Sequence, residues 1–176
     1  NTWVRSFVTA YYFCENGIFD IDKLILIQDY PNKQFFKETV KKGEIHKHWE
    51  SSQKNICSEK KVKFLKTHNS LITAFGNKFT KPEYTLGVIH IIRDPRNIIT
   101  SLKNHYDFET YERALKFMQD KNKVLEDYPH LKNYAKTNII NSWRINYQSW
   151  IFNKNFRRLT IRYEDMIENP QQTFEK

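Results

Sequence analysis

A nearly continuous run of β-branched and apolar residues, LGVIHII at residues 86–92, constrains the fold of this chain more than any other feature. Runs of this kind are typical of strands that are buried on both faces, which occur in parallel sheets covered by helices. The run ends at Arg93, and Pro95 suits the first turn of a helix with apolar positions at Ile98 and Leu102. We therefore expect a central strand that leads directly into a helix.

The rest of the chain alternates between helix and strand patterns. A helix packed along one face is predicted by the apolar stripe Val4, Phe7, Val8, Tyr11 and Tyr12, and Asn16-Gly17 would end it. Further helices are predicted within residues 33–61 near Phe35, Phe36 and Val40, over about residues 111–125, from 139 to 151 and after residue 165, with a break at Pro129. Strands are predicted at 62–65 and 159–163. Strands that alternate with helices predict an α/β fold with a parallel sheet, and 176 residues fit one domain.

Ligands of a parallel sheet bind beyond the carboxyl ends of its strands, beside the N-termini of the following helices. Arg93 stands at such a strand end, and Ser101 lies eight residues later, about two turns into the next helix. An arginine fork and a hydroxyl could converge there on one phosphate. The spacing alone also fits an Arg93–Asp94 surface pair with Ser101 merely exposed.

A second strand end carries Lys66-Thr67-His68. His68 could act as a general base, because an imidazole titrates near neutrality, and Lys66 would stabilise a developing anion on the same side. An ordinary surface histidine explains the position equally well. His46 and His48 beside Trp49 have no third ligand, so no metal site is expected.

The chain carries 29 Lys and Arg residues against 20 Asp and Glu residues, a formal net charge of +9. This excess favours an anionic partner, although the positive residues are scattered and also suit a solubilising surface. Cys14 and Cys57 cannot form a disulfide framework, which predicts a reducing, cytoplasmic compartment. No apolar run approaches the roughly 18 residues of a membrane span, and no signal peptide is visible in these residues.

Five segments, in order along the chain, resemble the cytosolic type of sulfotransferases that use 3'-phosphoadenosine 5'-phosphosulfate (PAPS). Asn1-Thr2-Trp3 resembles the end of their 5'-phosphosulfate loop, and FLKTHNS at residues 64–70 resembles their catalytic Lys-Thr-His segment. VIHIIRDPRNIITSLKNHY at 88–106 is similar to their 3'-phosphate motif. NSWRINYQSW at 141–150 and IRYEDMIENPQQTFEK at 161–176 are similar to two later landmarks of the family.

This resemblance implies a P-loop-like parallel sheet flanked by helices and an enzyme that moves a sulfuryl group from PAPS to a hydroxyl or amine, releasing the nucleotide PAP. It gives His68 the role of general base and Lys66 that of a charge stabiliser. It places the donor on Asn1, Thr2, Trp3, Arg93 and Ser101, with no metal ion. The implied acceptor is a small molecule or a glycan, bound by variable loops at residues 18–61 and 106–138.

The sequence departs from the family pattern at both of its ends. It lacks the Lys or Arg and the Gly of the phosphosulfate loop, and the Arg-Lys-Gly stretch that completes the 3'-phosphate pocket. We therefore expect residues 1–176 to be a single sulfotransferase domain truncated at these two loops. Ile140 stands where many relatives have an aromatic residue beside the adenine, so adenine contacts are expected to depend more on Trp3.

Two other functions fit the sequence less well. A P-loop kinase would need Gly-Lys-Ser/Thr before the first helix and a metal-binding Asp after a strand, whereas this chain shows Asn1-Thr2-Trp3. A binder of nucleic acid or other anions would need basic residues gathered on one face beside exposed aromatics. The aromatic residues here follow helical core stripes instead, so we expect no nucleic-acid partner.

Overall fold

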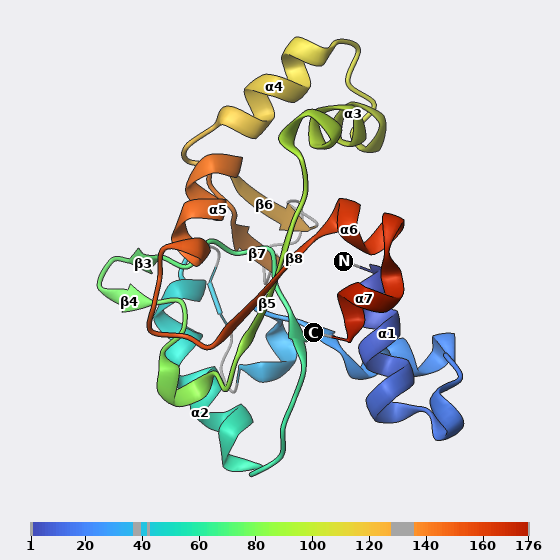
Figure 1. The fold of residues 1–176 in the computed structure, drawn as a ribbon. Helices are drawn as coiled ribbons and strands as arrows, with labels where there is room; N and C mark the ends of the chain where they lie inside the picture. Colours follow the sequence, from blue (N-terminus) through green and yellow to red (C-terminus); the bar gives the residue numbers. More distant parts are fainter. Residues whose placement is uncertain (1, 37–39, 42, 128–135, 176) are drawn as a thin grey trace.

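The computed structural model describes residues 2–36, 40–41, 43–127 and 136–175 (Figure 1). Its α-helices are α1 (Thr2–Phe13), α2 (Trp49–Ser58), α3 (Pro95–His105), α4 (Tyr111–Gln119), α5 (Trp143–Ile151), α6 (Tyr163–Glu168) and α7 (Pro170–Phe174). Its strands are β1 (Gln28–Asp29), β2 (Leu65–Lys66), β3 (Thr73–Ala74), β4 (Asn77–Lys78), β5 (Val88–Ile92), β6 (Val124–Asp127), β7 (Lys136–Ile139) and β8 (Arg158–Arg162). Short 3₁₀ turns occur at Glu15–Gly17, Ile21–Leu26, Lys33–Phe35, Ile45–His48 and Pro82–Tyr84.

The strands that lead toward the candidate site form two parallel pairs, β1 with β2 and β5 with β8. Parallel pairing among alternating helices and strands confirms the α/β class. Within the described residues the two pairs are not joined into one sheet. The other two pairs, β3 with β4 and β6 with β7, are antiparallel.

Strand β5 is less buried than its sequence predicts. None of its residues is fully buried, and the side chain of Ile89 is 42% exposed. The reason lies in its neighbours, because only β8 pairs with β5 among the described residues and the strand also borders a large cavity. The expected burial on both faces is therefore wrong for this structure, whereas the helix that begins at Pro95 is confirmed as α3.

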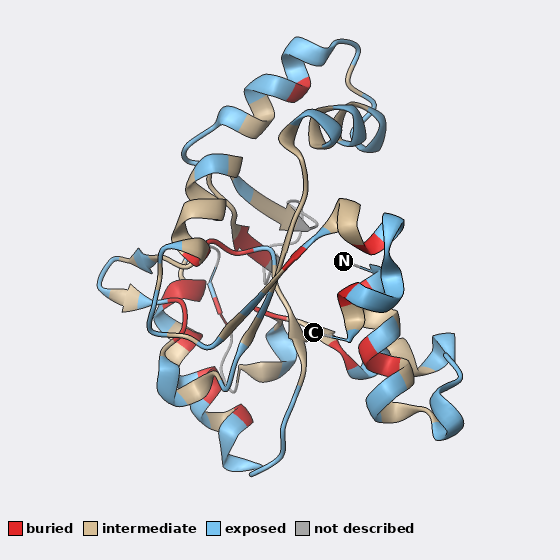
Figure 2. Cartoon of the chain, in the orientation of Figure 1, coloured by how far each residue is buried: buried red, intermediate tan, exposed pale blue. Residues whose placement is uncertain are grey.

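Two separate groups of apolar residues form the core, and Figure 2 colours the buried residues of the chain red. One joins α1 to β8 and α6 through Val4, Val8, Ile27, Ile161 and Met166. The other lies around α2 and α5 and consists of Tyr30, Trp49, Ile56, Phe79 and Trp150.

The predicted stripe of the first helix is only partly buried. Val4 and Val8 enter the core, but Phe7, Tyr11 and Tyr12 are 42%, 71% and 60% exposed. Phe7 instead stacks on Phe174 at 4.0 Å between ring centroids. A single face of α1 therefore packs on the core, and it is narrower than the stripe suggested.

Helix boundaries were predicted less well where a hairpin interrupts the helical pattern. The helix expected over residues 111–125 ends at Gln119, and Leu125 belongs to β6. The helix expected from residue 139 begins at Trp143, because the Ser142 side chain accepts a hydrogen bond from the Ile145 amide and caps it. Residue 139 itself ends β7, which pairs with β6. Pro129, where a break was predicted, lies outside the described residues.

Three shorter predictions also need correction. The strand expected at 62–65 is β2, and it retains only Leu65 from that range and adds Lys66. Residues 33–61 contain the turn Lys33–Phe35 and helix α2, so the helix lies later than the apolar positions around Phe35 suggested. The strand expected at 159–163 is β8, and Tyr163 already begins α6.

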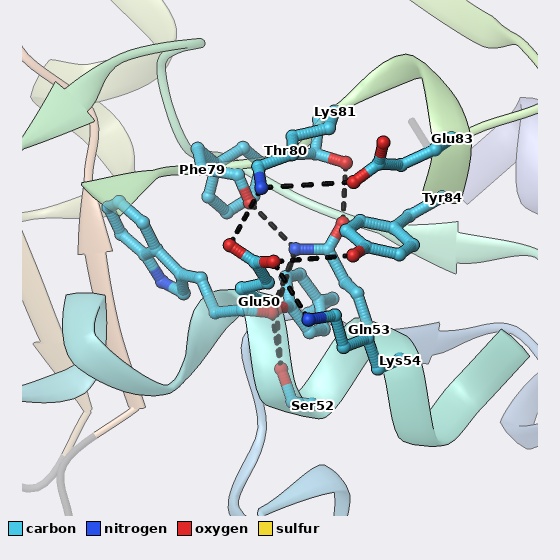
Figure 3. A network of polar contacts seen from close by, with 11 residues as sticks. Glu50, Ser52, Gln53, Lys54, Phe79, Thr80, Lys81, Glu83 and Tyr84 are labelled. Atoms are coloured by element: carbon cyan, nitrogen blue, oxygen red, sulfur yellow. Dashed lines mark hydrogen bonds and ion pairs between the residues drawn. The ribbon is translucent and has the colours of Figure 1, made fainter. Parts of the chain in front are cut away.

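A buried glutamine fastens the segment before β5 onto α2 (Figure 3). The Gln53 amide donates to the backbone oxygens of Phe79 and Trp49, at 2.8 and 3.0 Å, and accepts from the hydroxyl of Thr80. Outside this contact, Lys81 and Lys54 both pair with Glu50, at 2.7 and 3.0 Å. Residues 79–81 are thereby held against the helix, seven residues before β5 starts at Val88.

Replacing Gln53 with alanine should lower the free energy of unfolding by about 2 kcal/mol or more, because buried polar groups would lose their partners. Thermal or urea unfolding measures this change directly. Lys54→Ala is the matched control, since it removes only a surface ion pair worth at most about 1 kcal/mol. Equal effects of the two variants would contradict the structural role of Gln53.

No helix in the described ranges is long and apolar enough to span a lipid bilayer.

Candidate functional site

The loop that follows β2 carries His68 and is held from two sides. Asn69 is 1% exposed, and its side-chain oxygen accepts from the Ile139 amide at 2.6 Å. The Trp150 indole donates to the Asn69 backbone oxygen at 2.9 Å, and the Asn146 amide donates to the His68 backbone oxygen at 3.1 Å. Helix α5 and strand β7 therefore fix the backbone on which the exposed His68 side chain is mounted.

Lys66 is the last residue of β2 and lies beside Asp29, its register partner on β1. The Lys66 ammonium is 3.2 Å from the Asp29 carboxylate, and both side chains are partly buried. Opposite charges at this distance attract each other strongly when water is partly excluded. Lys66 is thus held in place by a counterion that an anionic ligand would have to share or displace. Sequence reasoning missed Asp29, which lies in a part of the chain with no recognisable motif.

Arg93 follows the last residue of β5, as expected, and lies over the ring of Tyr163 at 4.6 Å from guanidinium carbon to ring centroid. Its Nε atom is buried and has no hydrogen-bond partner in the described part of the chain. The neighbouring Asp94 carboxylate pairs with Arg96 instead, which lowers the pKa of Asp94 to about 2 through hydrogen bonds from that residue. Asp94 therefore pairs with Arg96. The alternative prediction of a surface pair between Arg93 and Asp94 is wrong.

The remaining donor residues lie on two helices, α3 and α1. Ser101 is exposed on α3, while Ile98 and Leu102 of the same helix face the cavity described below. Thr2 and Trp3 are exposed in the first turn of α1, and Trp3 is 53% exposed. Asn1, the other predicted member of this group, lies outside the described residues.

A cavity of about 1340 Å³ connects the two strand ends. Lys66, His68 and Arg93 all line it, whereas Trp3 and Ser101 do not. Such a volume exceeds the roughly 300–1,000 Å³ of usual ligand pockets. The structure therefore brings three of the predicted site residues to one space and leaves Thr2, Trp3 and Ser101 outside its walls.

Aromatic and apolar side chains of α5 and β5 form another wall of the cavity. Trp143 stacks on Tyr147 at 5.5 Å, and the Tyr147 ring is 6.0 Å from His90. Burial, with a smaller contribution from the charge of Arg158, lowers the pKa of His90 to about 4. His90 is therefore neutral at physiological pH. Ile140 also lines the cavity, next to this wall.

No cluster of three or more potential metal-ligating side chains occurs in the ranges that the structure describes. His46, one of the two histidines weighed as metal ligands, is buried and packs against Phe75 at 4.9 Å between ring centroids. It therefore belongs to the packing beside Trp49.

A family model described as "Sulfotransferase domain" matches residues 2–176. No curated protein matches the chain.

Proposed function

The chain belongs to the sulfotransferase family, whose enzymes transfer a sulfuryl group with PAPS as their general donor, and we propose that Lys66, His68 and Arg93 serve this reaction here. One observation carries the proposal. The ends of β2 and β5, two strands from separate parallel pairs, open into the same cavity and present a cation, an imidazole and a guanidinium to it. Donor and acceptor can be held together in a space of this kind.

The fold proposal is that both parallel pairs belong to one P-loop-like sheet within a single domain. The support is that both pairs are parallel and that one strand of each, β2 and β5, borders the same cavity of about 1340 Å³. Ligands of parallel sheets bind beyond the carboxyl ends of such strands.

In the proposed reaction, His68 removes the proton from an acceptor hydroxyl or amine. The acceptor oxygen or nitrogen then forms a bond to sulfur in line, as the bond between sulfur and the 5'-phosphate oxygen breaks. Negative charge develops on the departing phosphate, and Lys66 together with the backbone amides near Thr2 at the start of α1 stabilises it. These fixed positive groups supply charge stabilisation, so the proposal includes no metal ion.

The donor nucleotide is proposed to bind with its 3'-phosphate at Arg93 and Ser101 and its adenine at Trp3. The acceptor, a small molecule or a glycan, is proposed to bind to the segments at residues 18–61 and 106–138, which contain α2 and α4 as well as loops. A cytoplasmic location belongs to the same proposal, because Cys14 and Cys57 both carry free thiols.

Fluorescence of Trp3 provides a test of the adenine contact. Because Trp3 is 53% exposed, stacking of an adenine on it should change its emission when PAP is added, and inorganic sulfate should have no such effect. Trp3→Leu should weaken PAP binding without a change in the unfolding temperature. The same PAP affinity in Trp3→Leu and in the wild type would count against the assignment.

The proposed function is tested by sulfate transfer from labelled PAPS to a panel of alcohols, phenols and amines, with the intact protein. Labelled product should appear with at least one class of acceptor, and one PAP should be released for each sulfate transferred.

A further inference from the structure

Helices α3 and α4 pack against each other, and an aromatic cluster joins the end of α4 to the turn after α3 (Figure 1). The Tyr106 ring lies 5.5 Å from the ring of Phe108 and 4.8 Å from that of Phe117, between centroids. Phe108 and Phe117 are themselves 5.8 Å apart. All three separations fall in the range that aromatic pairs prefer, so the cluster fixes this end of the helix pair.

A second cavity, of about 310 Å³, opens beside this cluster. Its lining residues are three cations, two aromatic residues and one carboxylate: Arg113, Lys116, Lys123, Phe108, Phe117 and Asp120. Phe117 also lines the large cavity of the proposed active site. The two cavities therefore meet at this residue.

Positive charge predominates in the second cavity. Lys116 and Lys123 form no ion pair with a carboxylate in the part of the chain that the structure describes. Arg113 does pair with Glu109, at 3.4 Å, but both side chains are exposed, and such pairs contribute little to stability. Three positive side chains against the carboxylate of Asp120 leave an excess of two positive charges. This excess favours an anionic ligand.

Lys123 is held at the second cavity by contacts of its side chain and of its backbone. Its ammonium lies over the Phe117 ring, 4.1 Å from the centroid, in a cation–π contact. Its backbone oxygen accepts hydrogen bonds from the amides of Ile140 and Asn141, both at 3.0 Å. A cation that is fixed before the ligand arrives loses little freedom on binding, and it therefore contributes more affinity than a mobile surface lysine.

We propose that the second cavity binds an anionic group of the acceptor, a carboxylate or a sulfate on a sugar ring, while the hydroxyl to be sulfated lies at His68 in the large cavity. The inference rests on the proposed function, since it concerns the acceptor of that reaction. It names the substrate class as an acidic oligosaccharide. It assigns the recognition of the acid to Arg113, Lys116 and Lys123.

The shape of the second cavity favours a sugar acid over other anions. Its volume of about 310 Å³ is at the lower end of usual ligand pockets, so it fits one ring-sized group. An acceptor that reaches both cavities must extend past Phe117, as an oligosaccharide does and a single phenol does not. The guanidinium of Arg113 suits a planar carboxylate or a sulfate, and Phe108 offers an apolar wall to the ring that carries it. A carboxylate on a peptide side chain brings no such ring.

Three forms of one tetrasaccharide test the proposal with the intact protein saturated with PAP. The first contains one glucuronate, the second is its carboxyl-reduced, neutral form, and the third is the reduced form with an ester sulfate on the new hydroxyl. In calorimetric titrations we expect at least one acidic form to bind about tenfold more tightly than the neutral form. Added salt should diminish this advantage, because the cations are partly exposed.

The two acidic forms show whether the second cavity selects a carboxylate or a sulfate, and an advantage of either supports the proposal. Equal affinity of all three forms would overturn it. So would tighter binding of an acidic peptide of the same charge.

Variants of Lys123 connect the preference to the second cavity. Lys123→Met keeps an apolar chain over Phe117 but removes the charge, so the acidic forms should bind about tenfold less tightly while the neutral form and PAP bind as before. Lys123→Arg should retain the preference. In turnover, KM for the acidic acceptor should rise with little change in kcat. Lys121→Met is the matched control, because Lys121 is exposed and does not line the cavity. Equal losses in the two methionine variants would mean that general surface charge attracts the ligand, and would refute the site.

Two outcomes separate this inference from the proposed function. If acidic and neutral acceptors are sulfated with equal KM, and Lys123→Met changes neither value, the second site is wrong and the proposed function stands. If no acceptor is sulfated from PAPS, but the acidic tetrasaccharide still binds in a manner that depends on Lys123, the proposed function is wrong and the second cavity stands as a saccharide-binding site.

Discussion

Replacing His68 with alanine is expected to lower kcat by about 10²-fold or more and to leave PAP binding nearly intact. The imidazole is the proposed acceptor of the proton, and alanine has no group that can replace it. The loop should keep its shape, because its hydrogen bonds come from the His68 backbone oxygen and from Asn69. Activity of the wild type should also fall on the acid side, where a protonated imidazole cannot accept a proton.

The measurement is sulfate transfer by wild type and variant in parallel, with PAP affinity determined for both. His105→Ala serves as the control, because this exposed histidine near the end of α3 packs on Tyr106 and has no part in the proposed site. Near wild-type turnover of His68→Ala with any accepted substrate would place the base on another residue.

Replacing Arg93 with alanine should weaken the binding of PAP by about 10- to 100-fold and that of adenosine 5'-phosphate (5'-AMP) far less. A charge-assisted hydrogen bond to a phosphate contributes roughly 1.5–3 kcal/mol, and 5'-AMP lacks the phosphate that Arg93 is proposed to bind. Calorimetric titration of both nucleotides measures the ratio of the two losses.

Arg162→Ala is the matched control for Arg93. It removes the same charge from the end of the neighbouring strand, but its exposed side chain pairs with Asp165. Any long-range attraction for a nucleotide should be reduced similarly in the two variants, so that only Arg93→Ala discriminates between PAP and 5'-AMP. Equal losses of both nucleotides in Arg93→Ala would refute the phosphate assignment.

The strand end at Arg93 could be predicted because local signals agree there. An apolar run, a strand-ending arginine and a proline suited to a helix start follow one another within ten residues, 86–95. The structure shows strand and helix in this order, with Arg93 lining the cavity. Lys66 and His68 were placed for a similar reason, since a polar cluster directly follows a short apolar run.

Features that depend on distant contacts were not predictable in the same way. The hairpin of β6 and β7 joins residues whose apolar spacing continues that of the adjacent helices, so periodicity assigned Leu125 and Ile139 to helices. The partial exposure of β5 follows from which strands flank it, and the sequence of β5 carries no information on this. Local sequence predicts where an element starts better than it predicts which elements pack beside it.

The hydrogen bond that the Asp94 amide donates to the Glu164 carboxylate, at 2.9 Å, shows the same limit at the site. These residues are 70 positions apart, and only the parallel register of β5 and β8 brings them together. The dipeptide Glu164-Asp165 follows a predicted strand, as Arg93-Asp94-Pro95 does. Two strand ends of this kind share one edge of a sheet, and this signal could have directed attention to Glu164.

Sulfate transfer in the presence of a metal chelator tests the central claim most directly. The intact protein is incubated with EDTA and PAPS labelled at sulfur, and in parallel with Mg²⁺ and ATP labelled at the γ-phosphate, each with the same panel of alcohols, phenols, amines and glycans. We expect labelled sulfate on at least one acceptor, one PAP released per sulfate, and no transfer from ATP. Transfer of phosphate from ATP with Mg²⁺, while all sulfate label stays on the donor, would contradict it.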